Sequence, residues 1–124
     1  MSYEIPGFKN GTNTASADLS ACQFLYCKVS GAGTLTVCAA PTDIPYGVIQ
    51  NKPKLGQAVD AMIDGISKMV AGAAIAAGQE VGPNASGQAV PAVSGTRSRG
   101  IALEAASAAG QIIAVDINSS RLVP

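Results

Sequence analysis

Apolar and polar residues alternate with a period of two along several short segments of this 124-residue chain. Residues 34–38 alternate in this way, with Leu35 and Val37 separated by polar Thr36. Period two is the repeat at which successive side chains of a strand point to opposite faces of a sheet. Residues 24–29 are rich in β-forming side chains, and residues 30–33 read as a turn. Residues 24–38 are therefore expected to form a β-hairpin.

The same reasoning predicts further strands downstream. In residues 99–105, Ile101 and Leu103 share one face, whereas Ala102 and Glu104 share the other. Residues 118–124 are expected to be a tail. The remaining predicted strands cover residues 46–51, 79–82, 88–93 and 113–117.

Glycine followed by glutamine marks the turns between these segments. Glycine adopts positive φ without steric cost, so it ends tight turns and lets the next strand begin. Regular punctuation of this kind is typical of a small all-β domain. The four pairs are Gly56-Gln57, Gly78-Gln79, Gly87-Gln88 and Gly110-Gln111.

The pattern in residues 55–74 fits two kinds of element. Apolar residues at helical spacing form one stripe, but residues 58–63 also alternate as a strand would. Three glycines disfavour a helix, and Asp64-Gly65 is a strong hairpin turn between two strands. Periodicity alone leaves helix and strand equally supported here.

The N-terminal residues differ from the rest of the chain. Residues 1–19 are interpreted as an extended arm and a flexible linker, and residues 20–124 as a single domain. An extended segment can add a strand to an exposed sheet edge. We expect the arm to become ordered only when docked, and residues 1–18 to be removable without loss of stability. The residues expected to contact a partner surface or a neighbouring subunit are Tyr3, Ile5, Pro6, Phe8 and Lys9.

Composition points to a protein that is covered by other protein. Charged residues make up 13% of the chain and aromatic residues 4%, whereas 48% of residues are hydrophobic. A surface so poor in charge favours self-association or assembly. Because eight basic residues balance eight acidic ones, the chain lacks the positive footprint of a nucleic-acid binder.

No catalytic or metal-binding constellation is evident. The chain contains no histidine, which excludes Ser-His-Asp and Cys-His sites. Ser67 and Lys68 would point to opposite faces of a strand, and Asp60 and Asp64 read as solvated residues beside a turn. We expect no metal, no cofactor and no membrane span.

Three cysteines and the lack of a secretory signal indicate a reducing cytoplasm, with Cys27 and Cys38 buried as small hydrophobic residues.

The order of several segments resembles a known family. They begin with Gly47-Val48-Ile49-Gln50-Asn51-Lys52-Pro53 and Gly56-Gln57-Ala58-Val59, and continue with Gly65-Ile66-Ser67-Lys68-Met69-Val70-Ala71-Gly72, Ile75-Ala76-Ala77-Gly78, Gly100-Ile101-Ala102-Leu103-Glu104-Ala105-Ala106 and Gly110-Gln111-Ile112-Ile113-Ala114-Val115. Together they resemble the capsid decoration (cement) proteins of tailed bacteriophages over about residues 46–117. Residues 1–40 carry no matching motif.

The resemblance implies an all-β fold, a small β-barrel or β-tulip with an extended N-terminal arm. It also implies two strands turning at Asp64-Gly65. It implies a non-enzymatic virion protein, made in the host cytoplasm, that binds the major capsid protein on the outer surface of an expanded head. The family functions as a homotrimer that stabilises the shell against internal DNA pressure.

Two other functions were considered. A biotinyl or lipoyl carrier domain presents one modified lysine on a hairpin, and Lys68-Met69 resembles part of its motif. A head fibre or adhesion module would require a long apical loop or a further domain, and neither is expected here.

Overall fold

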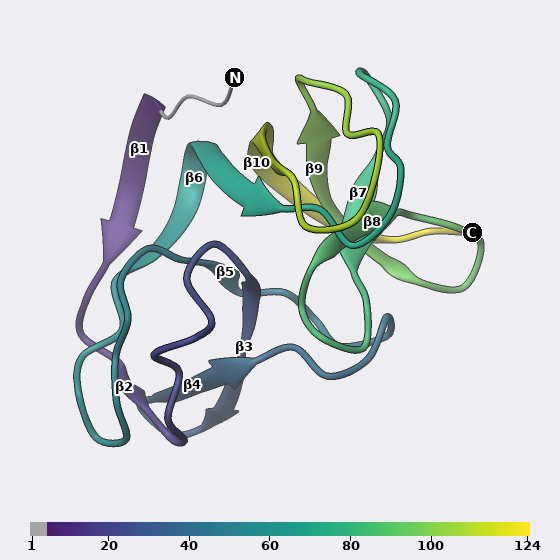
Figure 1. Cartoon of the computed structure of the whole chain (residues 1–124). Coiled ribbons are helices and arrows are strands. Elements are labelled where there is room, and N and C mark those ends of the chain that lie inside the picture. Colours follow the sequence, from purple (N-terminus) through teal and green to yellow (C-terminus); the bar gives the residue numbers. More distant parts are fainter. Residues whose placement is uncertain (1–4) are drawn as a thin grey trace.

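The computed structural model describes the backbone of residues 5–124 and the side chains of residues 11–117 and 120–124. The described chain contains ten strands and no helix, which confirms the all-β prediction (Figure 1). The strands are β1 (Ile5–Asn10), β2 (Thr14–Ala15), β3 (Tyr26–Gly31), β4 (Thr34–Val37), β5 (Gly47–Ile49), β6 (Ala61–Val70), β7 (Val81–Pro83), β8 (Ala89–Pro91), β9 (Arg97–Ala102) and β10 (Ile112–Leu122).

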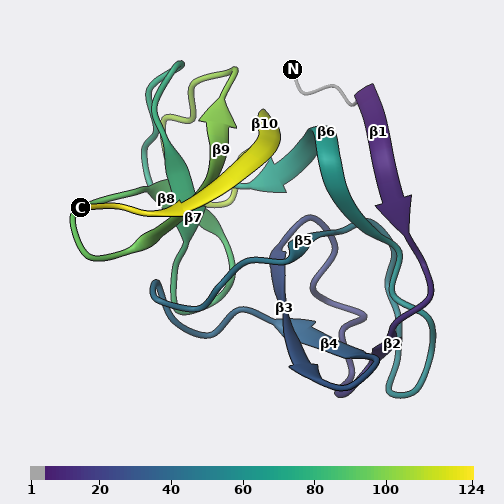
Figure 2. The ribbon, with the colours of Figure 1, turned by 180° about the vertical axis from the view of Figure 1, so that it is seen from behind.

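Eight strands form one mixed sheet with the order β2-β4-β3-β5-β6-β10-β9, and β1 pairs with β6 outside this path. Only β2 and β4 run parallel within the described sheet, and β7 and β8 form a separate hairpin. Figures 1 and 2 show two lobes, one with β2 to β5 and one with β7 to β10, with β6 crossing between them. The sheet of residues 5–124 does not close into a barrel, because its path ends at β2 and β9 without joining them, so the barrel form of the predicted fold is not found.

Neither the helix nor the hairpin considered for residues 55–74 is present. Residues 61–70 of this segment instead form one strand, β6. It runs without reversal through Asp64-Gly65, so the predicted turn at this position is wrong. Gly65 has a φ of 115° and pairs with Pro6 of β1. Its positive φ bends the strand rather than turning it back. Pairing along both edges then holds the bent strand in an extended course.

Two hydrophobic cores lie on either side of β6. Adjacent residues of this strand point to opposite faces, so Met62 enters one core and Ala61 enters the other. The first core also contains Tyr26, and the second contains Ala15 and Leu19. The predicted flexible linker is therefore wrong in its second half, because burial of these two side chains ties residues 14–19 to the body. A separate unit ending at residue 19 remains a prediction.

The predicted hairpin at residues 24–38 is confirmed as β3 and β4, and the predicted strand at residues 46–51 as β5. The predicted tail at residues 118–124 is wrong, because β10 continues to Leu122 and pairs with β9 through residues 120–122. Arg121 further fixes this end through a two-pronged salt bridge to Glu80, with Nε–Oε2 and Nη2–Oε1 distances of 2.7 and 2.8 Å.

Residues 5–10 form β1, which lies at the periphery beside β6 (Figure 1). The arm is thus ordered within its own chain, contrary to the expectation that it orders only on docking. Pairing with the edge of β6 gives the backbone N–H and C=O groups of β1 hydrogen-bonding partners that an isolated arm would lack.

Candidate interaction surface

The outer face of β6, β10 and β9 carries several apolar side chains, which surround Lys68 and Asp116. Strand register places Ile66, Asp116 and Ile101 side by side on this face, and Val70 beside Ile112. The alternate residues Ser67, Met69, Ile113 and Val115 point inward and are buried. We define the apolar sheet face as Ile66, Val70, Ile101, Leu103 and Ile112.

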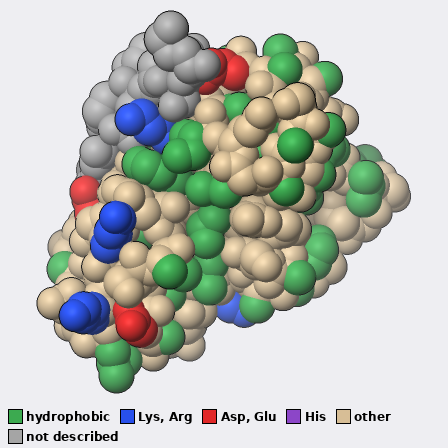
Figure 3. Space-filling model, in the orientation of Figure 1, with side chains coloured by type: hydrophobic (Ala, Val, Ile, Leu, Met, Phe, Trp, Pro, Cys, Tyr) green, Lys and Arg blue, Asp and Glu red, His purple; other side chains and the backbone are tan. Residues whose placement is uncertain are grey.

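Three members of the apolar sheet face are large and exposed. Ile101 is 50% exposed, Leu103 38% and Ile112 43%. The inward positions of β9 are instead taken by small residues, since Ser98 and Ala102 are buried. The predicted alternation is confirmed for Ile101 and Ala102, with the larger residue facing outward, but the strand predicted for residues 99–105 ends at Ala102, so Leu103 and Glu104 follow β9. Figure 3 shows many hydrophobic side chains and few charged ones on the visible face of the molecule.

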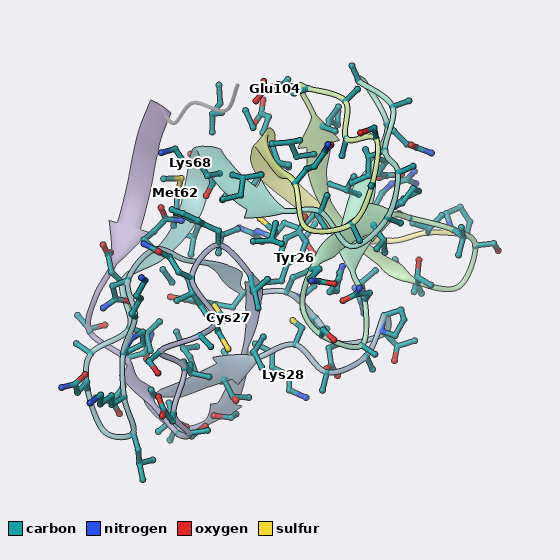
Figure 4. All side chains as sticks on the ribbon, viewed as in Figure 1. Tyr26, Cys27, Lys28, Met62, Lys68 and Glu104 are labelled. Atoms are coloured by element: carbon teal, nitrogen blue, oxygen red, sulfur yellow. The ribbon has the colours of Figure 1, made fainter. Side chains whose placement is uncertain are left out.

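Lys68 and Glu104 are engaged within the chain beside the apolar sheet face, whereas Asp116, between Ile66 and Ile101, has a buried Oδ1 with no hydrogen-bond partner among the described residues. The Nζ of Lys68 lies over the ring of Phe24, 5.9 Å from its centroid, at a distance typical of a cation–π contact. Glu104 accepts a hydrogen bond from the Ala114 amide at 2.9 Å, across from Lys68 in the strand register. Figure 4 shows Lys68 on β6 and Glu104 near the upper end of the β9–β10 lobe.

Phe24 is held in an unusual backbone conformation next to β6. Its φ of 65° is rare for a bulky residue and is strained. Two backbone hydrogen bonds hold it, one from its amide to Ile49 O at 2.7 Å and one from the Val70 amide to its carbonyl at 3.1 Å. The strained turn thereby places an aromatic ring against Lys68 at the edge of the sheet.

An open groove of about 860 Å³ lies on the opposite lobe, between β3 and the loop at residues 42–46. Lys28 forms a 2.9 Å salt bridge with Asp43 in this groove, and Val29 and Ile44 are exposed beside it. Hydrogen bonds from the Ala39 amide and from Lys28 hold the pKa of Asp43 below its usual value. The polar part of the groove is thus satisfied internally.

The junction between the lobes is built from Tyr26 and Arg99. The Tyr26 hydroxyl donates to Arg99 O, and Arg99 Nη2 donates to Ile63 O at 2.5 Å. Burial raises the pKa of Tyr26 and lowers that of Arg99. The basic segment at residues 97–99 is therefore part of a strand that links the lobes.

The structure separates the residues considered for catalysis or modification. Ser67 is buried, with its Oγ accepting from Gln50 and donating to Lys68 O, whereas Lys68 points to the outer face. Lys68 lies within β6 opposite Ala114 and not on a hairpin turn. The described residues contain no group of three or more His, Cys, Asp or Glu side chains that could hold a metal ion.

The cysteine prediction is confirmed. Cys27 and Cys38 are buried, and burial raises the pKa of both thiols to about 12. Cys22 is partly exposed, and all three cysteines are free.

The contact residues predicted in the arm are only partly described. Tyr3 lies outside the described residues, whereas the backbone of Ile5, Pro6, Phe8 and Lys9 forms β1. Sequence reasoning did not single out the apolar sheet face. The available signal was the small residues at alternate positions in β9. Small residues fit where two strands pack closely, so they mark the inward face and leave the larger residues outward.

The family model described as phage cement protein matches residues 9–117. The fold is also similar to the crystal structure of the N base of head fiber gp8.5 in bacteriophage phi29. The two are 24% identical with a TM-score of 0.67, and the match covers 93% of this chain and 95% of that chain. No curated protein matches the sequence. Among the described residues, no helix is long and apolar enough to cross a membrane.

Proposed function

The chain belongs to the phage cement protein family, and from this premise we propose that it binds the outer surface of an expanded phage head as a homotrimer. It is a structural, non-enzymatic component associated with the head. In the proposed role it contacts the major capsid protein and stabilises the shell against internal DNA pressure.

The observation that carries the proposal is the apolar sheet face. Three large aliphatic side chains are exposed here: Ile101 on β9, Leu103 directly after β9, and Ile112 at the start of the neighbouring strand β10. Clustered exposed apolar residues on a rigid sheet are characteristic of surfaces that bind protein. Charged residues are scarce and sum to zero, so the attraction must come mainly from burial of apolar area.

Trimerisation would add avidity to weak individual contacts. Once one subunit of a trimer is bound, the other two are held at high effective concentration near their own sites. A small apolar face on each subunit is then sufficient for stable attachment. Three such subunits around a threefold axis also link neighbouring capsid proteins, which is how attachment would resist outward pressure.

The carrier-domain alternative receives no support. A modifying ligase requires its lysine on an accessible hairpin turn, whereas Lys68 lies within a ten-residue strand with its Nζ over Phe24. The likeness to the head fiber base concerns the fold alone, since the two sequences are 24% identical.

The proposal is tested by measuring binding to purified expanded, empty heads. The variant Ile101→Ser with Ile112→Ser should bind at least about tenfold more weakly, because it removes two exposed aliphatic side chains worth together roughly 2–4 kcal/mol when buried. Its circular dichroism spectrum should match that of the parent. Leu55→Ser is the control, since Leu55 is 68% exposed and lies outside the apolar sheet face. Equal binding by the double variant and the parent would contradict the proposal.

We also propose that the arm residues Tyr3, Ile5, Pro6, Phe8 and Lys9 contact the capsid or a neighbouring subunit. Deletion of residues 1–10 is the suitable test, because a deletion through residue 18 would remove Ala15 from the second core. The shorter deletion should weaken head binding at least about tenfold if the arm contributes more than 1.4 kcal/mol. Undiminished binding would show that the arm has no anchoring role.

A further inference from the structure

Strand β1 lies at the periphery of the sheet and is followed by a short exposed connection, an arrangement that permits exchange of this strand between copies. We propose that, in the assembled homotrimer, β1 of each copy pairs with β6 of the next copy. This proposal rests on the proposed homotrimer and names the partner of the arm as a second copy of this chain.

The first argument is the position of β1 in the sheet. Strand β6 pairs along one edge with β5 and β10, while residues 61–66 pair along the other edge with β1. Strand β1 lies off the main path of the sheet and at its periphery (Figures 1 and 2). Removal of β1 would leave the order of the other strands intact and would open the same edge in each copy.

The second argument is the short connection that follows β1. Residues 11 and 12 are exposed, and a side chain added at Gly11 would meet nothing within 4 Å. Downstream of this connection the chain is held in place, since Asn13 O accepts from the Val59 amide at 2.9 Å and the Ala15 amide donates to Gln57 O at 2.8 Å. A change of direction at residues 11–12 could therefore redirect β1 without disturbing the second core.

The third argument is the irregular pairing of β1. The register with β6 shifts twice, between Pro6 and Phe8 and between Phe8 and Lys9. Pro6 has no amide proton to donate to the ladder, and it lies opposite the positive-φ residue Gly65. Release of such a strand costs less than release of a regular one of equal length. In the exchanged trimer each β1 pairs with a β6 of identical sequence in the next copy, so the pairing lost on release is formed again.

A second copy fits this edge better than a coat-protein segment does. If β1 bound the coat protein, the edge of β6 would be left open in every copy, which is an aggregation hazard. Exchange around a closed ring instead fills each β6 edge with an identical β1. Only the direction of residues 11–12 changes, so the same sheet accommodates both the monomer and the linked trimer.

Disulfide crosslinking between copies that each carry one introduced cysteine tests the exchange. Cys22→Ser removes the partly exposed native thiol, while Cys27 and Cys38 stay buried. One set of full-length copies then carries Ile5→Cys and another carries Ile66→Cys, which are paired positions of β1 and β6. The two sets are produced together, bound to expanded heads and oxidised. We expect a covalent dimer that is absent when either set is oxidised alone.

The double variant Ile5→Cys with Ile66→Cys gives the complementary result. In exchanged copies its disulfides join three chains into a covalent trimer, whereas in copies that retain β1 they close within one chain. Phe8→Cys with Asp64→Cys, a second paired position with an exposed residue on β6, repeats the test if the first pair fails to fold. Lys28→Cys with Thr36→Cys in the β3–β4 hairpin is the matched control and should close only within one chain.

The outcomes separate this proposal from the proposed function. Copies locked by an intrachain β1–β6 disulfide that still trimerise and bind heads would overturn the exchange and leave the proposed function standing. A protein that remains monomeric and does not bind heads would overturn both. Interchain crosslinks at β1 and β6, together with intrachain closure of the hairpin control, support the exchange.

Discussion

Tyr26→Phe tests whether the two lobes are held together by the hydrogen bond at their junction. The Tyr26 side chain is fully buried, and its hydroxyl donates to the carbonyl oxygen of Arg99 on β9. Because Tyr26 belongs to β3 and Arg99 to β9, the bond links strands that lie in different lobes (Figure 1). The substitution removes this donor and keeps the aromatic ring in place.

The expected loss follows from the full burial of Tyr26 and the partial burial of its hydrogen bond to Arg99 O. A buried acceptor that loses its donor costs about 1–3 kcal/mol. For a chain of this size, each kcal/mol lowers the melting temperature by roughly 3–5 °C. Tyr26→Ala additionally removes the ring from the first core and should cost about 3–5 kcal/mol, a large share of a typical total of about 5–15 kcal/mol.

Urea unfolding followed by circular dichroism measures both losses. Leu55→Ala is the control, because an exposed side chain outside both cores should change the free energy of unfolding by less than about 0.5 kcal/mol. An unchanged midpoint for Tyr26→Phe would refute the reasoning, since it would mean that the junction does not depend on this hydrogen bond. A loss as large as that of Tyr26→Ala would mean that the ring had moved as well.

Three further outcomes are expected from burial and charge. Val115→Asp should abolish cooperative thermal unfolding, because an unpaired carboxylate at this fully buried position costs several kcal/mol. A thiol reagent should label Cys22 in the native protein and reach Cys27 and Cys38 only after denaturation, because thiols with a pKa of about 12 stay protonated and both are buried. Hydrogen bonds from Arg121 and Ser98 lower the pKa of Glu80 to about 2, so its stabilising contribution is present above pH 4.5 and is lost as the pH falls from 4.5 toward 2. Glu80→Gln should therefore flatten the acid side of a stability–pH profile measured by urea unfolding.

The structure explains why parts of the sequence prediction were correct. The glycines of all four Gly-Gln pairs, Gly56, Gly78, Gly87 and Gly110, have positive φ values between 78° and 92°. Positive φ is sterically costly for other residues, so glycine at these positions indicates the turns from the sequence alone. Strands β3 and β4 form a local hairpin whose alternation and turn lie within one short segment, so no distant information was needed.

The candidate surface was less predictable. Alternation in β9 shows which residues share a face, but it does not show which face packs inward. Small residues pack inward here because β9 lies close to its neighbours, and Ile101 and Leu103 are left exposed. The arm was correctly seen as a segment able to add a strand, but its pairing with β6 of its own chain depends on an edge created by distant residues.

By itself, the sequence determined the all-β class, the positions of the four Gly-Gln turns, the buried cysteines and the family to which the chain belongs. Each of these depends on local backbone preference, on the polarity of single side chains, or on the order of short motifs. Tertiary structure alone decided that β6 is one bent strand, that Ala15 and Leu19 complete a core, and that β10 continues to Leu122. These features depend on hydrogen bonds and apolar contacts between residues far apart in the chain, which no local pattern specifies.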